Sequence, residues 1–224
     1  MTKKVIIWGN SDFAKLVYNY IKEDNKYEII AFCTDDIYVK TNSFCNLPLI
    51  PFSNLSKFSP SEYMFLIAIG YTKINSVRKE IFERLKNLGY KFISYIHPSN
   101  IIADNVQIGE NCILFENNII EKFVSIENNV FIWSNTFIGH NSTIKQHSFI
   151  AASTTIGGYS EIGEESFIGL NTTIKDKIKI GKKCLIGAGA IILKNLDHYS
   201  VNIPEGTKTA KFTSEQYLKY GFNI

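Results

Sequence analysis

An unbroken six-residue repeat of aliphatic residues runs through the middle of this 224-residue chain. A period of six fits neither the roughly 3.6-residue period of an α-helix nor a long flat strand, and it is typical of a solenoid of hexapeptide units. Each unit supplies a short strand and a turn, and it buries one side chain in a stack that only neighbouring coils complete. The repeated positions, termed the ladder, are Ile102, Ile108, Leu114, Ile120, Ile126, Ile132, Ile138, Ile144, Ile150, Ile156, Ile162, Ile168, Ile174, Ile180, Ile186 and Ile192.

Two flanking positions of the repeat support the same interpretation. Small or β-branched residues stand two places before most ladder positions, as a tight turn inside a narrow coil requires. Glycine often follows a ladder residue, where we expect it to supply a positive φ or a close approach of two backbones. The first set is Val106, Cys112, Val124, Val130, Thr136, Ser142, Ser148, Thr154, Ser160, Ser166, Thr172, Ile178, Cys184 and Ala190, and the second is Gly109, Gly139, Gly157, Gly163, Gly169, Gly181 and Gly187.

Composition is that of an ordinary globular protein, with 45% hydrophobic and 20% charged residues. A net charge of +3 is too small to indicate a nucleic acid or a membrane surface as partner. No signal peptide is recognisable, and no apolar stretch approaches the ~20 residues of a membrane span. The 4 cysteines lack paired spacing. We therefore expect a cytoplasmic protein with reduced cysteines, without disulfides or a zinc cluster.

Before the repeat, the pattern changes to strands that alternate with helices. We expect strands at 5–8, 27–34, 63–70 and 91–96, and helices at about 12–23 and 75–88. This order indicates a small parallel sheet covered by helices, a Rossmann-like domain. The predicted organisation is an α/β domain at 1–97, a solenoid at 98–196, and a tail at 197–224 whose helix, near 214–220, caps the open end of the solenoid.

Ligands of such sheets bind beyond the carboxyl ends of the strands. Only the first glycine of the dinucleotide fingerprint is present, so we do not expect NAD, although the helix that begins after Gly9 could hold a phosphate. Gly9 has a plainer possible role, which is to permit a tight turn. The candidate substrate-binding residues at three strand ends are Gly9, Asn10, Ser11, Asp35, Asp36 and Gly70.

The α/β domain, the junction Ile96-His97-Pro98-Ser99 and the hexad series together resemble a family of bacterial sugar acyltransferases. This family comprises the sialic-acid O-acetyltransferases and the bacillosamine and perosamine N-acetyltransferases, and the resemblance covers essentially the whole chain. It implies a left-handed parallel β-helix, an exception to the right-handed crossover rule. It also implies a homotrimer, acetyl-CoA bound between adjacent β-helices, no metal, and a nucleotide-linked sugar held by the N-terminal domain.

The resemblance assigns the chemistry to His140, which follows Ile138-Gly139 and matches the family's catalytic histidine. Attack on a thioester requires the acceptor to lose a proton near neutral pH, for which an unperturbed imidazole, with a pKa of about 6.5, is suited. No serine or cysteine nucleophile is needed, because the thioester is already activated. Asn141 stands where several relatives have Glu or Asp, so it would fix the tautomer without adding charge. Alternatively, a carboxylate such as Glu116 approaches from a neighbouring coil or subunit.

The same resemblance supplies candidate cofactor residues. Gly158 would contact the thioester carbonyl in an oxyanion role. Leu170, Gly187 and Ala188 match positions that line the pantetheine slot. The CoA phosphates could be met by Lys182, Lys183 and Lys194, and the alternative is that each of these lysines is a solvated charge.

Further candidates lie close to His140 in the sequence. Ser134 and Asn135 precede it and are expected to bind the acceptor. His147 is either a surface or interface histidine or, at a trimer interface, a neighbour of His140 in another subunit. The remaining histidines, His97 and His198, flank the repeat and are expected to be structural.

The function that these residues support best is acetyl-CoA-dependent transfer to an amino group of a nucleotide-linked sugar in glycan biosynthesis. O-acetylation of a sugar hydroxyl stays open, because the same base and cleft serve both acceptors. A non-catalytic trimeric scaffold is a third possibility, supported by Asn141 in place of an acid. A β-helical carbonic anhydrase would need three histidine ligands for zinc, and only His140 and His147 are central.

Overall fold

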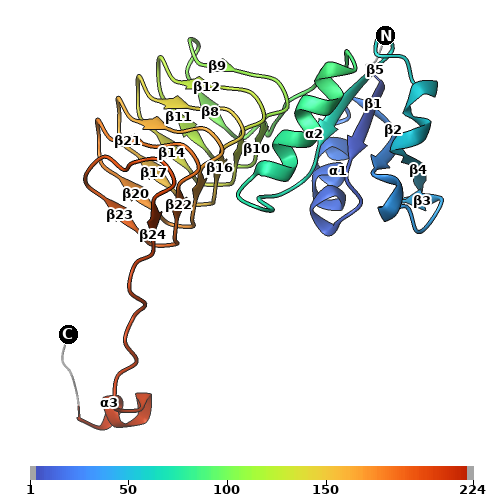
Figure 1. The fold of residues 1–224 in the computed structure, drawn as a ribbon. Coiled ribbons are helices and arrows are strands. Elements are labelled where there is room, and N and C mark those ends of the chain that lie inside the picture. Colours follow the sequence, from blue (N-terminus) through green and yellow to red (C-terminus); the bar gives the residue numbers. More distant parts are fainter. Residues whose placement is uncertain (1–3, 221–224) are drawn as a thin grey trace.

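The computed structural model describes residues 4–220 and contains an α/β domain, a β-helix against which it packs, and a C-terminal segment (Figure 1). The elements of the first domain are β1 (Lys4–Trp8), α1 (Asp12–Asp24), β2 (Glu28–Thr34), η1 (Asp36–Tyr38), β3 (Ser43–Phe44), β4 (Leu47–Pro51), η2 (Phe52–Lys57), β5 (Tyr63–Ile67), α2 (Ser76–Asn87) and β6 (Lys91–Phe92). The sheet has the order β3-β4-β2-β1-β5-β6 and is parallel except for the β3–β4 hairpin.

The hexads form two-residue strands in three parallel sheets. The first sheet holds β7 (Tyr95–Ile96), β10 (Ile113–Leu114), β13 (Phe131–Ile132), β16 (Phe149–Ile150), β19 (Phe167–Ile168), β22 (Leu185–Ile186) and β24 (Val201–Asn202). The second holds β8 (Ile101–Ile102), β11 (Ile119–Ile120), β14 (Phe137–Ile138), β17 (Thr155–Ile156), β20 (Thr173–Ile174) and β23 (Ile191–Ile192). The third holds β9 (Gln107–Ile108), β12 (Ser125–Ile126), β15 (Thr143–Ile144), β18 (Glu161–Ile162) and β21 (Lys179–Ile180).

Each coil of the β-helix is three hexads long, so that Ile120 pairs with Ile138 and Ile138 with Ile156. The ladder side chains stack in the core between the three sheets, with Ile138, Ile150 and Ile168 completely buried. The predicted left-handed parallel β-helix behind a small α/β domain is confirmed. The expected strand at 91–96 is split, because β6 completes the α/β sheet and β7 pairs with β10.

At each corner of the coils one residue has a left-handed backbone conformation, and it stands at a position of the repeat that the sequence analysis did not single out. Every sixth residue from Asn111 to Lys183, three places before a ladder residue, has a φ between 53° and 65°. Many of these residues are asparagine, which tolerates this conformation well. The glycines after the ladder, expected to supply either a positive φ or a close backbone approach, do not have a positive φ. A Cβ at Gly139 would lie 2.5 Å from the main-chain nitrogen of Gly158, so close backbone approach accounts for glycine there.

The N-terminal domain covers the outer face of the first sheet. Phe13 of α1 contacts the rings of Phe115, Phe131 and Trp133. Arg78 of α2 is completely buried and lies over the ring of Phe131, with 4.2 Å between the guanidinium carbon and the ring centroid. Aromatic contacts and a buried cation therefore hold the two domains together.

His147 lies in this joint rather than on the surface. It is 2% exposed, its Nδ1 is 2.8 Å from Nδ2 of Asn129, and its ring meets Phe82 of α2 edge-on. His147 is therefore neither a surface histidine nor accessible to the His140 of another subunit, because α2 covers this corner of the β-helix. The pKa of His147 is lowered to about 4, chiefly by burial and also by the charges of Lys79 and Arg78.

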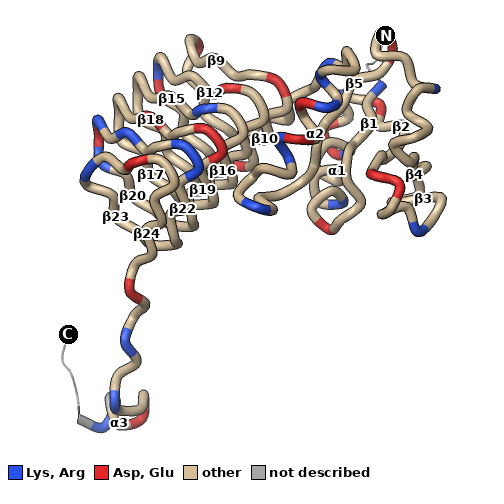
Figure 2. The backbone as a smooth tube through the Cα atoms, viewed as in Figure 1, with Lys and Arg blue, Asp and Glu red and all other residues tan. Residues whose placement is uncertain are grey.

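The C-terminal helix α3 (Ser214–Tyr220) is where the sequence predicted a helix, but its position differs from the expectation. The chain leaves β24 as an exposed extended segment, and α3 lies away from the last coil (Figure 1). The helix therefore does not cap the open end of the β-helix. In the view of Figure 2, basic and acidic segments are interspersed along both domains.

The joint predicts a pH dependence of stability. A buried histidine whose pKa falls from about 6.5 to about 4 is neutral in the folded chain, whereas the unfolded chain binds the proton more tightly. His147 should therefore make the free energy of unfolding fall, by at most about 3 kcal/mol, as the pH drops from about 6.5 to about 4. In His147→Asn, which places at this corner the residue found at Asn111 and Asn129, that fall should be smaller. Urea unfolding at several pH values measures both slopes, and equal slopes would contradict this assignment.

Candidate active site

The corner between the second and third sheets presents His140 to solvent. It follows β14 directly after Gly139, and its side chain is exposed. The next coil places Gly158 beside it, where an added Cβ would lie 3.1 Å from Nε2 of His140. The ring of Tyr159 meets the imidazole edge-on, with 5.0 Å between the centroids. The β-helix thus holds an accessible imidazole against a glycine of the following coil.

Asn141 fixes the orientation of this imidazole. Its Oδ1 lies 3.0 Å from Nδ1 of His140, and its own φ of 59° turns the side chain back toward the ring. An amide oxygen only accepts, so the neutral ring carries its proton on Nδ1. Nε2 then has a free lone pair, and among residues 4–220 it has no hydrogen-bond partner. This tautomer is the one that a general base at Nε2 requires.

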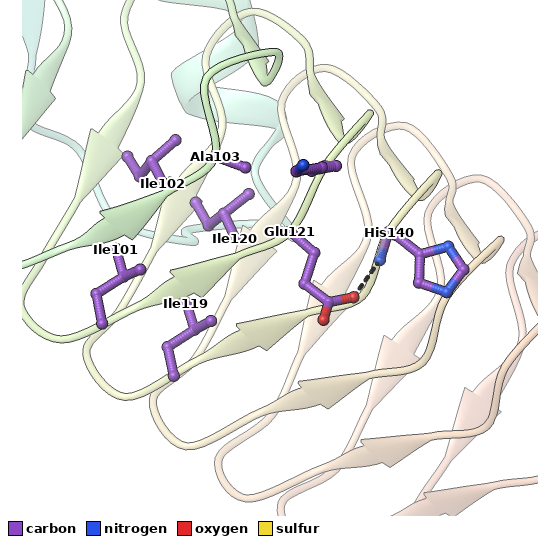
Figure 3. Close-up of a pocket in the computed structure, with 8 residues that line it drawn as sticks. Ile101, Ile102, Ala103, Ile119, Ile120, Glu121 and His140 are labelled. Atoms are coloured by element: carbon purple, nitrogen blue, oxygen red, sulfur yellow. Dashed lines mark hydrogen bonds between the residues drawn. The ribbon is translucent and has the colours of Figure 1, made fainter.

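A pocket of about 420 Å³ opens beside His140 on the second sheet (Figure 3). Its floor is apolar, because the outward side chains of β8 and β11 are isoleucines. The polar groups on its rim are Glu121, Lys122 and His140. The full lining is Ile101, Ile102, Ala103, Ile119, Ile120, Glu121, Lys122 and His140.

The carboxylate next to His140 is Glu121 and not Glu116, which the sequence suggested. Oε2 of Glu121 accepts a hydrogen bond of 2.8 Å from the main-chain N–H of His140 (Figure 3). Glu116 instead accepts hydrogen bonds from Tyr20 of α1 and, at 2.8 Å, from Ser134. Burial opposes its ionisation, but these hydrogen bonds outweigh burial and lower the pKa of its carboxyl below the ordinary value. Within the chain, Glu116 therefore links a corner of the β-helix to α1.

The candidate cofactor residues flank the second sheet on both edges. Gly158 shares the corner of His140, whereas Leu170 and Ala188 stack at the corner that precedes the sheet, in successive coils. Both side chains are exposed, and Gly187 stands beside Ala188. Ser134 and Asn135 lie at the same corner as Leu170, two coils earlier. The candidate cofactor and acceptor residues thus lie at the two corners that border the second sheet.

The lysines proposed for the CoA phosphates divide into two groups. Lys182 and Lys183 lie at the third corner, where they pair with Glu164 and Glu165 at distances between 3.2 and 3.9 Å. That corner also faces Lys79 of α2, which pairs with the same two glutamates, so within the chain both lysines have acidic partners. Lys194 remains exposed in the corner column of His140 and Gly158.

The candidates in the N-terminal domain lie at the ends of neighbouring strands, as predicted, and several have structural partners. Gly9 has a φ of 130°, and a Cβ there would lie 2.9 Å from the carbonyl oxygen of Ala68, so the turn itself requires glycine. Ser11 caps α1, and Asn10 donates to the carbonyl of Tyr38. The remaining contacts join Asp35 to Arg84, Asp36 to the N–H of Ser53, and the carbonyl of Gly70 to Arg78.

Two polar residues of the pocket, Glu121 and Lys122, were missed from the sequence, and so was Tyr159, whose ring lies against His140. A signal for two of them existed, because Lys122 stands one 18-residue coil before His140, and Tyr159 stands one coil after Asn141.

In the described part of the chain, no group of three or more His, Cys, Asp or Glu could hold a metal ion. No helix within residues 4–220 is long and apolar enough to span a membrane.

Comparison with known proteins finds a family model that matches part of each domain. Residues 4–85 match the PglD N-terminal domain, and residues 93–188 match the GMPPB C-terminal domain. UDP-N-acetylbacillosamine N-acetyltransferase of Bacillus subtilis is 30% identical over 114 residues, which are 50% of this chain and 51% of that protein. The match thus spans about half the length of this curated relative.

Solved structures share the order of the two domains. A mutant of perosamine N-acetyltransferase from Caulobacter crescentus, in complex with CoA and GDP-perosamine, superposes with a TM-score of 0.81 at 18% identity over 91% of this chain and 95% of its own. The acetyltransferase domain of PglB from Neisseria gonorrhoeae, in complex with acetyl coenzyme A, gives 0.77 at 22% identity over 88% and 94%. At these identities the likeness establishes the fold.

The fold and the corner histidine thus define a β-helical protein of the hexapeptide-repeat class with an attached α/β domain. Within this class, the predicted resemblance to the bacillosamine and perosamine N-acetyltransferase type is confirmed.

The contact between Asn141 and His140 makes a spectroscopic prediction. Long-range ¹H–¹⁵N correlation spectra of protein with labelled histidine should show Nδ1 of His140 protonated and Nε2 free above about pH 8. Asn141→Gly keeps the positive φ but removes the acceptor, so the ring should return to the common Nε2–H tautomer. Asn141→Asp should retain the Nδ1–H form. An Nε2–H signal in the unmodified protein would refute the assigned hydrogen bond.

Proposed function

We propose that this protein is an acetyl-CoA-dependent acetyltransferase that acts on an amino group of a nucleotide-linked sugar, with His140 as the general base. The observation that carries the proposal is the accessible His140, which lines the pocket, whose Nδ1 faces Asn141 and whose Nε2 lies beside Gly158. Support for the substrate class comes from the relative in Bacillus subtilis and from the complexes with CoA, acetyl-CoA and GDP-perosamine.

The proposed reaction is direct attack. The amine nitrogen forms a bond to the thioester carbonyl carbon while Nε2 of His140 takes its proton, and the C–S bond then breaks as the sulfur leaves and is protonated. Asn141 holds the imidazole in the reactive tautomer throughout. The main chain at Gly158, where no side chain intervenes, would donate to the developing oxyanion.

The cofactor and the acceptor are proposed to meet at the second sheet. Acetyl-CoA would lie along the corners of Gly158 and of Leu170, Gly187 and Ala188, and the sugar would occupy the pocket beside His140. Outward isoleucines on this sheet are exposed, with Ile101 at 67% and Ile191 at 69%. Exposed apolar side chains of this size favour association, which supports a homotrimer whose neighbouring β-helix completes the cleft. The N-terminal strand ends, with Asn10, Ser11 and Asp35, would face the nucleotide.

An acceptor panel with a base-free variant tests the proposal. Release of free CoA thiol should be observed with UDP-N-acetylbacillosamine or GDP-perosamine and should fall about 10²- to 10⁴-fold in His140→Ala, the range typical of a lost general base. The melting temperature should not change, because the side chain is exposed. His198→Ala, at a corner away from the pocket, is the matched control and should keep full activity.

Two outcomes would decide against the proposal. Unchanged turnover in His140→Ala would remove the general-base role. Thiol release with sialic acid but with neither amine acceptor would favour the O-acetyltransferase alternative.

A further inference from the structure

The carboxylate of Glu121, which lines the pocket, has a hydrogen-bond partner on only one of its two oxygens within residues 4–220. Oε2 of Glu121 accepts the main-chain N–H of His140 at 2.8 Å, whereas Oε1 has no hydrogen-bond or ion-pair partner among residues 4–220. The side chain lines the pocket above the apolar floor of Ile101 and Ile119 (Figure 3). A carboxylate beside apolar groups gains most from a positively charged partner.

The next corner of the β-helix shows what such an oxygen binds when a partner is present. Glu127, one hexad after Glu121, accepts the N–H of Gln146 through Oε2 at 3.0 Å, which is the same contact over the same spacing. Its Oε1 holds the ammonium of Lys145 at 3.0 Å. The two corners therefore carry the same carboxylate arrangement, with an ammonium on one of them.

The difference between the corners lies in one position. Lys145 stands one coil after Glu127, and the corresponding residue one coil after Glu121 is Gly139. A Cβ at Gly139 would lie 2.5 Å from the nitrogen of Gly158, so this coil cannot supply a lysine there. The place that an ammonium fills at Glu127 is therefore left to the pocket at Glu121.

The rim of the pocket carries one negative and one positive side chain, which suits an acceptor that itself carries both a positive and a negative group. Lys122 also lines the pocket, is exposed, and has no ion pair in the described part of the chain. A nucleotide-linked amino sugar carries a positive amine and a negative diphosphate, whereas a sugar with a hydroxyl in place of the amine lacks the positive group. One free carboxylate and one free ammonium complement the first ligand better than the second.

We propose that Glu121 binds the protonated amino group of the acceptor and makes the site selective for amines over hydroxyls. This inference rests on the proposed function. The bound ammonium first gives up one proton, through His140, to solvent. The free amine then attacks the thioester carbon, its second proton moves to His140, and the C–S bond breaks. The departing thiolate takes that proton, so the sum is an amide, a thiol and one released proton.

The test compares two matched variants. Glu121→Gln keeps an oxygen for the His140 N–H but loses the charge, and Glu127→Gln makes the same change where the pocket is not involved. With GDP-perosamine or UDP-N-acetylbacillosamine, whichever the unmodified protein acetylates, Glu121→Gln should raise KM for the sugar at least about 10-fold, the loss of a charge-assisted contact. KM for acetyl-CoA and the melting temperature should stay as they are, and Glu127→Gln should change neither KM.

Calorimetry supplies the selectivity readout. The unmodified protein should bind the amino sugar nucleotide at least about 10-fold more tightly than its counterpart with a hydroxyl in place of the amine, and Glu121→Gln should remove that preference. An unchanged KM and preference in Glu121→Gln, with the unmodified protein active, would overturn the role of Glu121 alone. An unmodified protein that acetylates neither amine refutes the proposed function instead. Equal effects of the two variants would reduce Glu121 to a structural contact.

Discussion

Burial of one aliphatic side chain per hexad is the constraint on which the rest of the molecule depends. Ladder residues such as Ile138 and Ile156 reach the core only if each coil is three hexads long, and this length brings residues 18 apart into columns at the corners. Residues that are one coil apart in the sequence are therefore neighbours in space at each corner. His140 meets Gly158 because one coil separates them, and the asparagine-rich positions with positive φ keep every corner equally tight.

Much of the fold and part of the site could be predicted from the sequence. The ladder predicted the β-helix because a hexad period is incompatible with other regular structures. His140 and Asn141 were found through the resemblance, and the contact between them follows from their adjacency. The hairpin of β3 and β4 was missed, since its strands are short and β4 contains Pro48 and Pro51, which argue against a strand.

Other parts could not be predicted, because they depend on how the two domains pack and on side-chain conformations. His147 occupies the corner position that Asn141 holds six residues earlier, and the placement of α2 buries His147 whereas Asn141 is exposed. Glu121 is 19 residues from the N–H that it binds, and neither composition nor periodicity shows that its carboxylate turns toward that group. The ion pairs of Lys182 with Glu164 and of Lys183 with Glu165 could not be predicted from the sequence either, because they depend on how successive coils stack.

The joint between the domains has a consequence for how such proteins can diverge. Arg78 donates to the carbonyl oxygens of Asn129, His147 and Ser148, and Asn75 donates to those of Glu165 and Ser166. These five hydrogen bonds, from Arg78 in α2 and from Asn75 just before it, are made to the main chain of successive coils and do not depend on which side chains stand there. Substitutions along that corner can therefore accumulate while these donors keep their acceptors, whereas the first sheet must keep the aromatic side chains that Phe13 contacts.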